Sequence, residues 1–414
     1  MGKVRWLSGI VLVLLSVLML RSVCKEQIAQ AIVEGYEMEG ALSTALVLSP
    51  HSSEAHFKLG RLYLYNPEKR NLDSAILHLE KAAQLSPYSY RVWLELGKAR
   101  EQAGLIEAAR TAFARSSALA PKSFEALWAR ANFLLRNAEA HESIWALRQA
   151  IELQPASLPL ALELAYQKYG NSLTDTEKIV PTDLLSRLNY ALFLVNVNQP
   201  TAAVTLVSEI AGKGFEESHY ALLRQIVDTL YQKRYFSEAK TVWLYYAQAN
   251  APQLGVATLE SVFNGSFDYS TQLGYFDWSI PQINGVEISE LSTHNNGLLR
   301  LVFNKKNVDL YGPAQVIPVR AGKSYRLSFR KHSQALFAAG QIFVEVYDVV
   351  DYQRLNLAST PLKSDEPWNT EELSFTTTAE TNAIVLRVRR PKLNKFDSLI
   401  EGVAEFDDFQ LISQ

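Results

Sequence analysis

Apolar residues recur with the spacing of amphipathic helices up to about residue 250, and they alternate with polar residues beyond it. Four similar phrases, Leu-x-Pro-x-Ser, interrupt the helical part at 48–52, 85–89, 119–123 and 153–157. Pro87, Pro121 and Pro155 are spaced 34 residues apart. Because proline cannot continue a helix and serine can cap the next one, each phrase predicts a joint between two helices. The even spacing predicts a stack of repeated helix pairs.

The unit that ends at Pro121 shows the clearest motif. It carries large residues at Trp93 and Phe113 and small ones at Gly97 and Ala109. These residues and their spacing resemble the tetratricopeptide repeat, a helix pair of 34 residues. The resemblance is best over residues 53–155, and weaker repeats extend it on both sides. It implies an α-solenoid over residues 25–250, in which no helix pair buries its apolar face without a neighbour.

Solenoids of this family present the inner faces of their first helices as a groove. The resemblance places the following residues on that face: Phe57, Arg61, Leu64, Arg91, Leu94, Lys98, Trp128 and Asn132. The functional interpretation is a groove for a protein partner, with apolar anchors beside positive charge. The alternative is a solvated inner face that neighbouring helices partly cover. The Lys/Asn clamp with which some family members hold a C-terminal carboxylate is not reproduced.

The first 24 residues form a separate segment. Two basic residues precede an uncharged apolar run from Trp6 to Leu20, which as a helix spans about 22 Å against roughly 30 Å of hydrocarbon. Extension past Arg21 to Cys24 would complete the span, because an arginine side chain can reach the interface. We therefore expect residues 1–24 to be a single-pass anchor in a bacterial inner membrane, with the bulk of the chain periplasmic. A cleaved signal peptide is the alternative.

The C-terminal part changes to short β-branched and aromatic runs separated by turn residues. A linker at 251–258 is expected to lead into an antiparallel β-sandwich at 259–414. LESVFNGSFDY, AGKSYRLSF and FDDFQL, in this order, resemble carbohydrate-binding modules with a galactose-binding-like jelly roll. LGYFDWSI and THNNGLLRLVF are similar to segments of bacterial repeat-plus-sandwich proteins from exopolysaccharide clusters. The expected fold class is multidomain, α then β: a transmembrane helix, a tetratricopeptide solenoid and a jelly roll.

A polysaccharide ligand would lie on aromatic rings, with polar side chains reading its hydroxyl groups. The candidates are Tyr275, Trp278, Tyr311, Arg326, Arg330, Arg387 and Arg389. Trp368 and Phe267 are assigned to the core. The two arginine pairs would form one basic patch if their strands were neighbours, and such a patch suits an acidic polysaccharide or lipid head groups. The alternative is a solvated sheet face on which acidic residues pair with these arginines.

The same resemblance implies one further site. Modules of this type often hold a structural calcium ion between their first and last strands. Asp268, with Asp407 or Asp408, matches those positions, and calcium prefers carboxylate and carbonyl oxygens. No other cofactor is expected.

Composition narrows the function. A formal net charge of −2 argues against nucleic acid as a partner, and a single cysteine excludes an internal disulfide. AGKS at 321–324 lacks the earlier glycine of a phosphate-binding loop, and the histidines show no zinc-binding spacing. We therefore expect no enzyme but a membrane-anchored scaffold in exopolysaccharide or envelope assembly, whose groove binds protein and whose sandwich binds polysaccharide. The alternatives are a protein-interaction scaffold with the sandwich as a structural cap, and a glycan-active enzyme.

Overall fold

The computed structural model describes residues 2–137, 140–250, 258–269, 272–292, 297–338, 342–394 and 398–414. Contacts divide the chain into two compact units, Met1–Thr182 and Asp183–Gln414. This boundary differs from the expected linker at 251–258, which apart from its last residue lies outside the described residues. The last helices of the chain therefore belong to the same unit as the strands.

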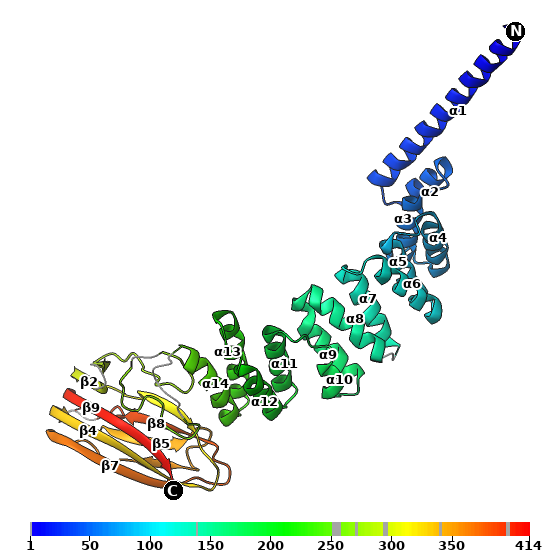
Figure 1. Ribbon diagram of the computed structural model, residues 1–414. Coiled ribbons are helices and arrows are strands. Elements are labelled where there is room, and N and C mark those ends of the chain that lie inside the picture. Colours follow the sequence, from blue (N-terminus) through cyan, green and yellow to red (C-terminus); the bar gives the residue numbers. More distant parts are fainter. Residues whose placement is uncertain are drawn as a thin grey trace. The chain divides into compact units, whose positions relative to one another are not determined.

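The first unit is helical (Figure 1). Its elements are α1 (Gly2–Gly35), α2 (Glu39–Leu48), α3 (Ser53–Tyr65), α4 (Leu72–Leu85), α5 (Tyr90–Gln102), α6 (Ile106–Leu119), α7 (Phe124–Arg136), α8 (Ala140–Leu153), a 3₁₀ turn (Pro155–Ser157), α9 (Leu158–Lys168) and α10 (Leu173–Glu177). The joints fall where the sequence predicts them, because Leu48, Leu85, Leu119 and Leu153 each end a helix. Ser52 and Ser123 cap the next helix, each accepting a backbone N–H at its Oγ atom.

The helices pair as α3–α4, α5–α6 and α7–α8, over the residues expected to form the best repeats. Small residues allow the two helices of a pair to approach. A Cβ atom on Gly60 would lie 2.5 Å from Cγ of Leu79, and one on Gly97 would lie 3.0 Å from the Phe113 ring. One core cluster, which contains Leu79 and Ala82 of α4 and Val92 and Leu96 of α5, joins the first two pairs. Each pair thus depends on its neighbour for burial.

Helix α1 corrects the expected membrane anchor. It continues past the apolar run, so that Arg21, Lys25 and Glu26 lie in the same helix. Among the described residues, no helix combines the length and the apolar character that a membrane crossing requires. The predicted transmembrane helix, and with it the single-pass inner-membrane location, is therefore wrong. The physical reason is the short run, which Arg21 interrupts before it can match the hydrocarbon thickness.

The second unit begins with four helices and continues with two sheets (Figure 1). The helices are α11 (Leu184–Asn196), α12 (Pro200–Ala211), α13 (Glu217–Gln232) and α14 (Phe236–Asn250). The strands are β1 (Val286–Ser292), β2 (Gly297–Lys306), β3 (Ala314–Pro318), β4 (Ser324–Ala338), β5 (Phe343–Asp348), β6 (Asn356–Ala358), β7 (Glu366–Thr376), β8 (Ala383–Arg389) and β9 (Ile400–Ser413).

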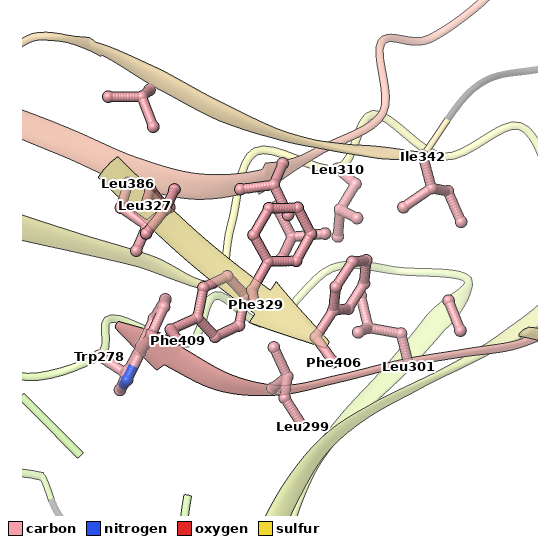
Figure 2. Packing of buried hydrophobic residues seen from close by; sticks show 14 of the residues in the cluster. Trp278, Leu299, Leu301, Leu310, Leu327, Phe329, Ile342, Leu386, Phe406 and Phe409 are labelled. Carbon is pink, nitrogen blue, oxygen red and sulfur yellow. The ribbon is translucent and has the colours of Figure 1, made fainter. Parts of the chain in front are cut away.

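The strands form an antiparallel sandwich, as the alternation of the sequence predicts. One sheet has the order β1-β2-β9-β4-β7 and the other the order β3-β8-β5-β6. The core lies between them and includes Leu301 of β2, Phe329 of β4, Leu386 of β8 and Phe406 of β9. Figure 2 shows these side chains packed together from both sheets. The strand β9 is central, because it pairs with β2 on one side and β4 on the other.

Helices α13 and α14 share a second core with the sandwich. The Trp243 side chain is fully buried, with its ring centroid 4.8 Å from that of Phe263 and 5.7 Å from that of Phe276. Tyr231 of α13 contacts Phe276 at 5.7 Å. Lys240, which is also fully buried, donates from Nζ to the carbonyl oxygen of Ser261. These contacts explain why the unit boundary precedes α11 rather than β1.

Candidate binding surfaces

A hollow of about 630 Å³ opens on the first helices of the repeats. Its apolar lining includes Trp128 and Ala129 of α7, and Leu160 and Leu164 of α9. Leu160 is 53 % exposed, and the Trp128 ring stacks on Phe124 with centroids 5.4 Å apart. An exposed apolar hollow of this size is typical of a binding site.

Two ion pairs form the rim of this hollow. The Nζ atom of Lys98 lies 3.0 Å from Oε1 of Glu95. Arg136 donates to both carboxylate oxygens of Glu101, at 2.8 and 2.9 Å. Because each rim cation already faces a carboxylate, the hollow offers an apolar floor inside a neutral polar border.

Arg61 lies one helix pair away and carries no such partner. Its guanidinium contacts the rings of Phe57 at 5.7 Å and Tyr65 at 6.0 Å, and among the described residues no carboxylate forms an ion pair with it. Tyr65 donates from its hydroxyl to Oε2 of Glu95, 2.6 Å away. Burial first, and then this bond to Glu95, raise the pKa of Tyr65. Arg61 also lines a hollow of about 350 Å³ with Lys58 of α3.

The structure separates the predicted groove residues into two groups. Lys98, Trp128 and Asn132 line the large hollow, while Arg61 and Arg91 are exposed and Phe57 is half-buried. Leu64 and Leu94 are instead buried, with exposed fractions of 3 % and 1 %. Their placement on the binding face is wrong, because neighbouring helices contact α3 and α5 on both sides. Leu160 and Leu164, beyond the best repeats, were not foreseen, although their spacing on one helix face indicates a shared surface.

A second surface, which we call the Trp368 face, lies on the outer side of the five-stranded sheet. The Trp368 ring of β7 stacks on His332 of β4 at 5.3 Å, and the Arg330 guanidinium lies 4.8 Å from the ring centroid. The Trp368 side chain is 36 % exposed, so part of its ring faces solvent. The sequence interpretation had assigned it to the core. Trp368 alternates with Thr370, Glu372 and Ser374, and this polar alternation is the signal for the outer face.

Polar side chains extend the Trp368 face across three further strands. Arg330 lies 3.3 Å from Oδ2 of Asp408 on β9. Glu405 of β9 is the register partner of His332, and it forms an ion pair with Arg300 of β2 at 3.2 Å. A flat aromatic ring beside alternating acids and bases is an arrangement that suits a sugar, whose apolar face can lie on the ring.

The aromatic candidates from the sequence lie elsewhere. Trp278 is 5 % exposed and packs in the core against Phe267 and Phe409, with its Nε1 donating to Asn264, so it is not an available platform (Figure 2). Tyr275 stacks on Tyr231 of α13 at 5.8 Å, because the helix pair covers this loop. Tyr311 is exposed.

The two arginine pairs do not form one basic patch. Arg326 and Arg330 lie on β4 of the five-stranded sheet, whereas Arg387 and Arg389 lie on β8 of the four-stranded sheet. Arg326 faces Glu372, Arg387 faces Glu345, and Arg389 faces Asp309. The predicted patch is therefore wrong, because the two strands belong to opposite layers. The alternative interpretation, a paired sheet face, describes these residues.

The three aspartates proposed for calcium lie near one another in electrostatic terms. Burial, and secondly the charges of Asp408 and Asp268, raise the pKa of Asp407 to about 6, against a hydrogen bond from the Asp408 N–H and the charge of Arg330. Arg330 lies 3.5 Å from Asp407 and 3.3 Å from Asp408, while Asp268 accepts from Ser266 and Gly297. Across the part of the chain that is described, no three His, Cys, Asp or Glu side chains form a metal-binding group. These carboxylates therefore do not form a calcium shell, and the ion stays a prediction.

Comparison with known proteins identifies the repeats. Residues 68–132 match the family model of the tetratricopeptide repeat. This segment spans the turn before α4 through most of α7, and this part of the chain is a tetratricopeptide scaffold for protein interaction. No curated protein matches the sequence.

Several solved structures are similar to parts of the chain. One, "Crystal structure of MamA protein", is 21% identical, covers 38% of this chain and 87% of its own, and has a TM-score of 0.32. "Crystal structure of YrrB: a TPR protein with an unusual peptide-binding site" is 12% identical, covers 52% and 94%, and has a TM-score of 0.28. "CBM4 structure and function" is 18% identical, covers 37% and 99%, and has a TM-score of 0.28. At these scores the likenesses carry no functional argument, and the carbohydrate-binding and exopolysaccharide resemblances stay predictions.

Proposed function

We propose that this chain is a non-catalytic binding protein with two separate sites, a protein site on the repeats and a polysaccharide site on the sandwich. The protein site is the hollow between α5, α7 and α9, whose exposed apolar lining supports a peptide ligand. The polysaccharide site is the Trp368 face. A protein that holds both ligands would bring a partner to a glycan, as exopolysaccharide or envelope assembly requires.

The single observation that carries the polysaccharide site is the exposed Trp368 ring on its Arg330 and His332 support. Two stacked neighbours fix the ring orientation, so a sugar would meet a platform that is already ordered. Asp408, Glu405 and Arg300 supply acceptors and donors for hydroxyl groups on the same face.

Affinity electrophoresis of the full chain through gels that contain single polysaccharides, neutral and acidic, tests this site. We expect at least one polysaccharide to retard the wild type, and Trp368→Ala to weaken that retardation by about tenfold or more. Trp145→Ala is the matched control, since Trp145 is exposed and also contacts an arginine, Arg130.

Two outcomes would contradict the proposal. If no polysaccharide retards the wild type, the sandwich is a structural cap on a protein-interaction scaffold. If Trp368→Ala leaves retardation unchanged, any glycan site lies elsewhere. Turnover of a polysaccharide by the purified chain would instead favour a glycan-active enzyme.

A further inference from the structure

The hollow on α5, α7 and α9 has a composition that narrows its ligand. Its volume of about 630 Å³ falls in the range of roughly 300–1,000 Å³ that is usual for ligand pockets. Ala129 occupies, one repeat later, the position that Glu95 holds in α5, and this small side chain leaves room beside Trp128. Leu160 keeps more than half of its surface in solvent at the open side. A bulky apolar side chain would fill this space and cover both residues.

The polar groups around the hollow argue against a terminal carboxylate as ligand. Asn132 uses its Nδ2 atom to donate to the carbonyl oxygen of Trp128, 2.8 Å away. Lys98 is held by Glu95, and Arg136 by both oxygens of Glu101. A free carboxylate in the hollow would have to break one of these bonds. The anchor is therefore better supplied by a neutral side chain within a chain segment.

The nearest cation without a carboxylate partner is Arg61. A continuous set of contacts connects it to the hollow: Arg61 lies on the Tyr65 ring, Tyr65 donates to Glu95, and Glu95 holds Lys98 at the rim. Packed helices lie about 8–10 Å apart, and an extended chain advances about 3.3 Å per residue. About three residues of extended peptide would thus connect the hollow to Arg61.

We infer that the repeats bind an internal segment of a partner protein, in which a bulky apolar residue fills the hollow and an acidic residue about three positions away pairs with Arg61. This inference rests on the proposed protein site and names its ligand chemistry. The charge follows from complementarity, because a carboxylate would supply Arg61 with the partner that it lacks in the described chain. The ligand needs no free C-terminus.

Selection of a random peptide library on the full chain tests the inference, with the peptides displayed so that their C-termini are fused to the carrier. We expect enrichment of peptides with Trp, Phe or Leu two to four residues from Asp or Glu. The selected peptides are then synthesised with both ends capped and titrated by fluorescence anisotropy. Leu160→Glu and Arg61→Glu should each weaken binding by about tenfold or more.

Two matched controls keep the measurement specific. Leu77→Glu places the same charge on an exposed leucine of α4, and Lys122→Glu reverses an exposed cation in the α6–α7 turn. Both should bind like the wild type. A peptide whose acidic residue is replaced by lysine should regain affinity for Arg61→Glu, which a general loss of folding cannot produce.

The failures are distinguishable. If peptides bind but carry no acidic residue, or bind Leu160→Glu and Arg61→Glu as tightly as the controls, the inferred ligand is wrong while the protein site stands. If the library yields no peptide that binds the wild type, both the ligand and the proposed peptide site are wrong.

Discussion

Lys240 of α14 donates from its Nζ atom to the carbonyl oxygen of Ser261, 2.8 Å away, and this bond joins the last helix to the segment that leads into the sandwich. The lysine is fully buried, and burial alone lowers its pKa from 10.5 to about 7. The joint between helices and sheets thus contains an ionisable group in an apolar setting, beside Trp243 and its aromatic neighbours.

This lysine should make the second unit more stable at alkaline pH. Its pKa in the folded chain lies below the ordinary value, so between pH 7 and about 10 the unfolded chain binds more protons. The free energy of unfolding should rise with pH in that window, by up to about 1.4 kcal/mol per pH unit. Urea unfolding at several pH values measures the slope. Lys240→Met should abolish it, and Lys213→Met, at an exposed position, should not.

The sandwich should not be stable without α13 and α14. A fragment of residues 259–414 loses Trp243 and Tyr231 and exposes Phe263 and Phe276, which are buried in the full chain. Exposed aromatic surface promotes association and dye binding. We expect this fragment to bind the dye ANS and to aggregate, and residues 183–414 to remain folded. Equal melting temperatures and dye binding for the two fragments would show that the shared core contributes nothing.

The small positions within the repeats should resist enlargement. In Gly60→Ala the added Cβ meets Leu79 at 2.5 Å, and we expect a loss of about 1–3 kcal/mol in the free energy of unfolding. Gly40→Ala, on α2, is the control, because nothing lies within 4 Å of its added Cβ. That change should be neutral or stabilising, by up to about 1 kcal/mol, through helix propensity. Chemical denaturation followed by circular dichroism compares the two.

Asp407 should act in the opposite direction from Lys240. Its pKa in the folded chain is raised to about 6 from 3.8, so between these values the folded chain binds more protons, and stability falls as pH rises. The slope should reach about 1.4 kcal/mol per pH unit at most, and Asp407→Asn should remove it, since an amide oxygen can still accept the Asp408 N–H. Thermal unfolding between pH 3.5 and 7 measures it.

The same variant tests the calcium prediction. A calcium ion beside Asp407 would favour the ionised carboxylate, so added calcium would raise the melting temperature of the wild type at pH 7 and leave Asp407→Asn unchanged. If calcium at millimolar concentration shifts neither protein, the prediction from the resemblance is wrong, and Arg330 serves these carboxylates instead.

The repeat architecture could be predicted from local signals. Leu48, Leu85 and Leu119 end helices because the proline two residues later cannot continue them, and this information is contained in five adjacent letters. Gly60 and Gly97 were likewise identified as points of close approach, because a fixed repeat assigns each position its neighbour. Short-range chemistry and fixed spacing were sufficient there.

The binding faces depend on information that local patterns lack. Alternation assigns Arg330 and Arg387 to strand faces, but it does not say that β4 and β8 belong to different sheets. Trp278 looked available because its loop is irregular, yet Phe267 and Phe409 enclose it from distant parts of the chain. Lys240 shows no sequence signal for burial at all, since the segment that covers it follows in a different kind of structure.

The central place of β9 has a consequence for synthesis on the ribosome. Its partners β2 and β4 precede it by about a hundred residues or fewer, and until it emerges each has an open edge. The helical repeats can form pair by pair as they leave the exit tunnel, whereas the sandwich must wait for residues 400–413 before its larger sheet can close. Nascent chains halted before that point would expose the apolar surfaces of β2 and β4 and would be the forms that chaperones bind.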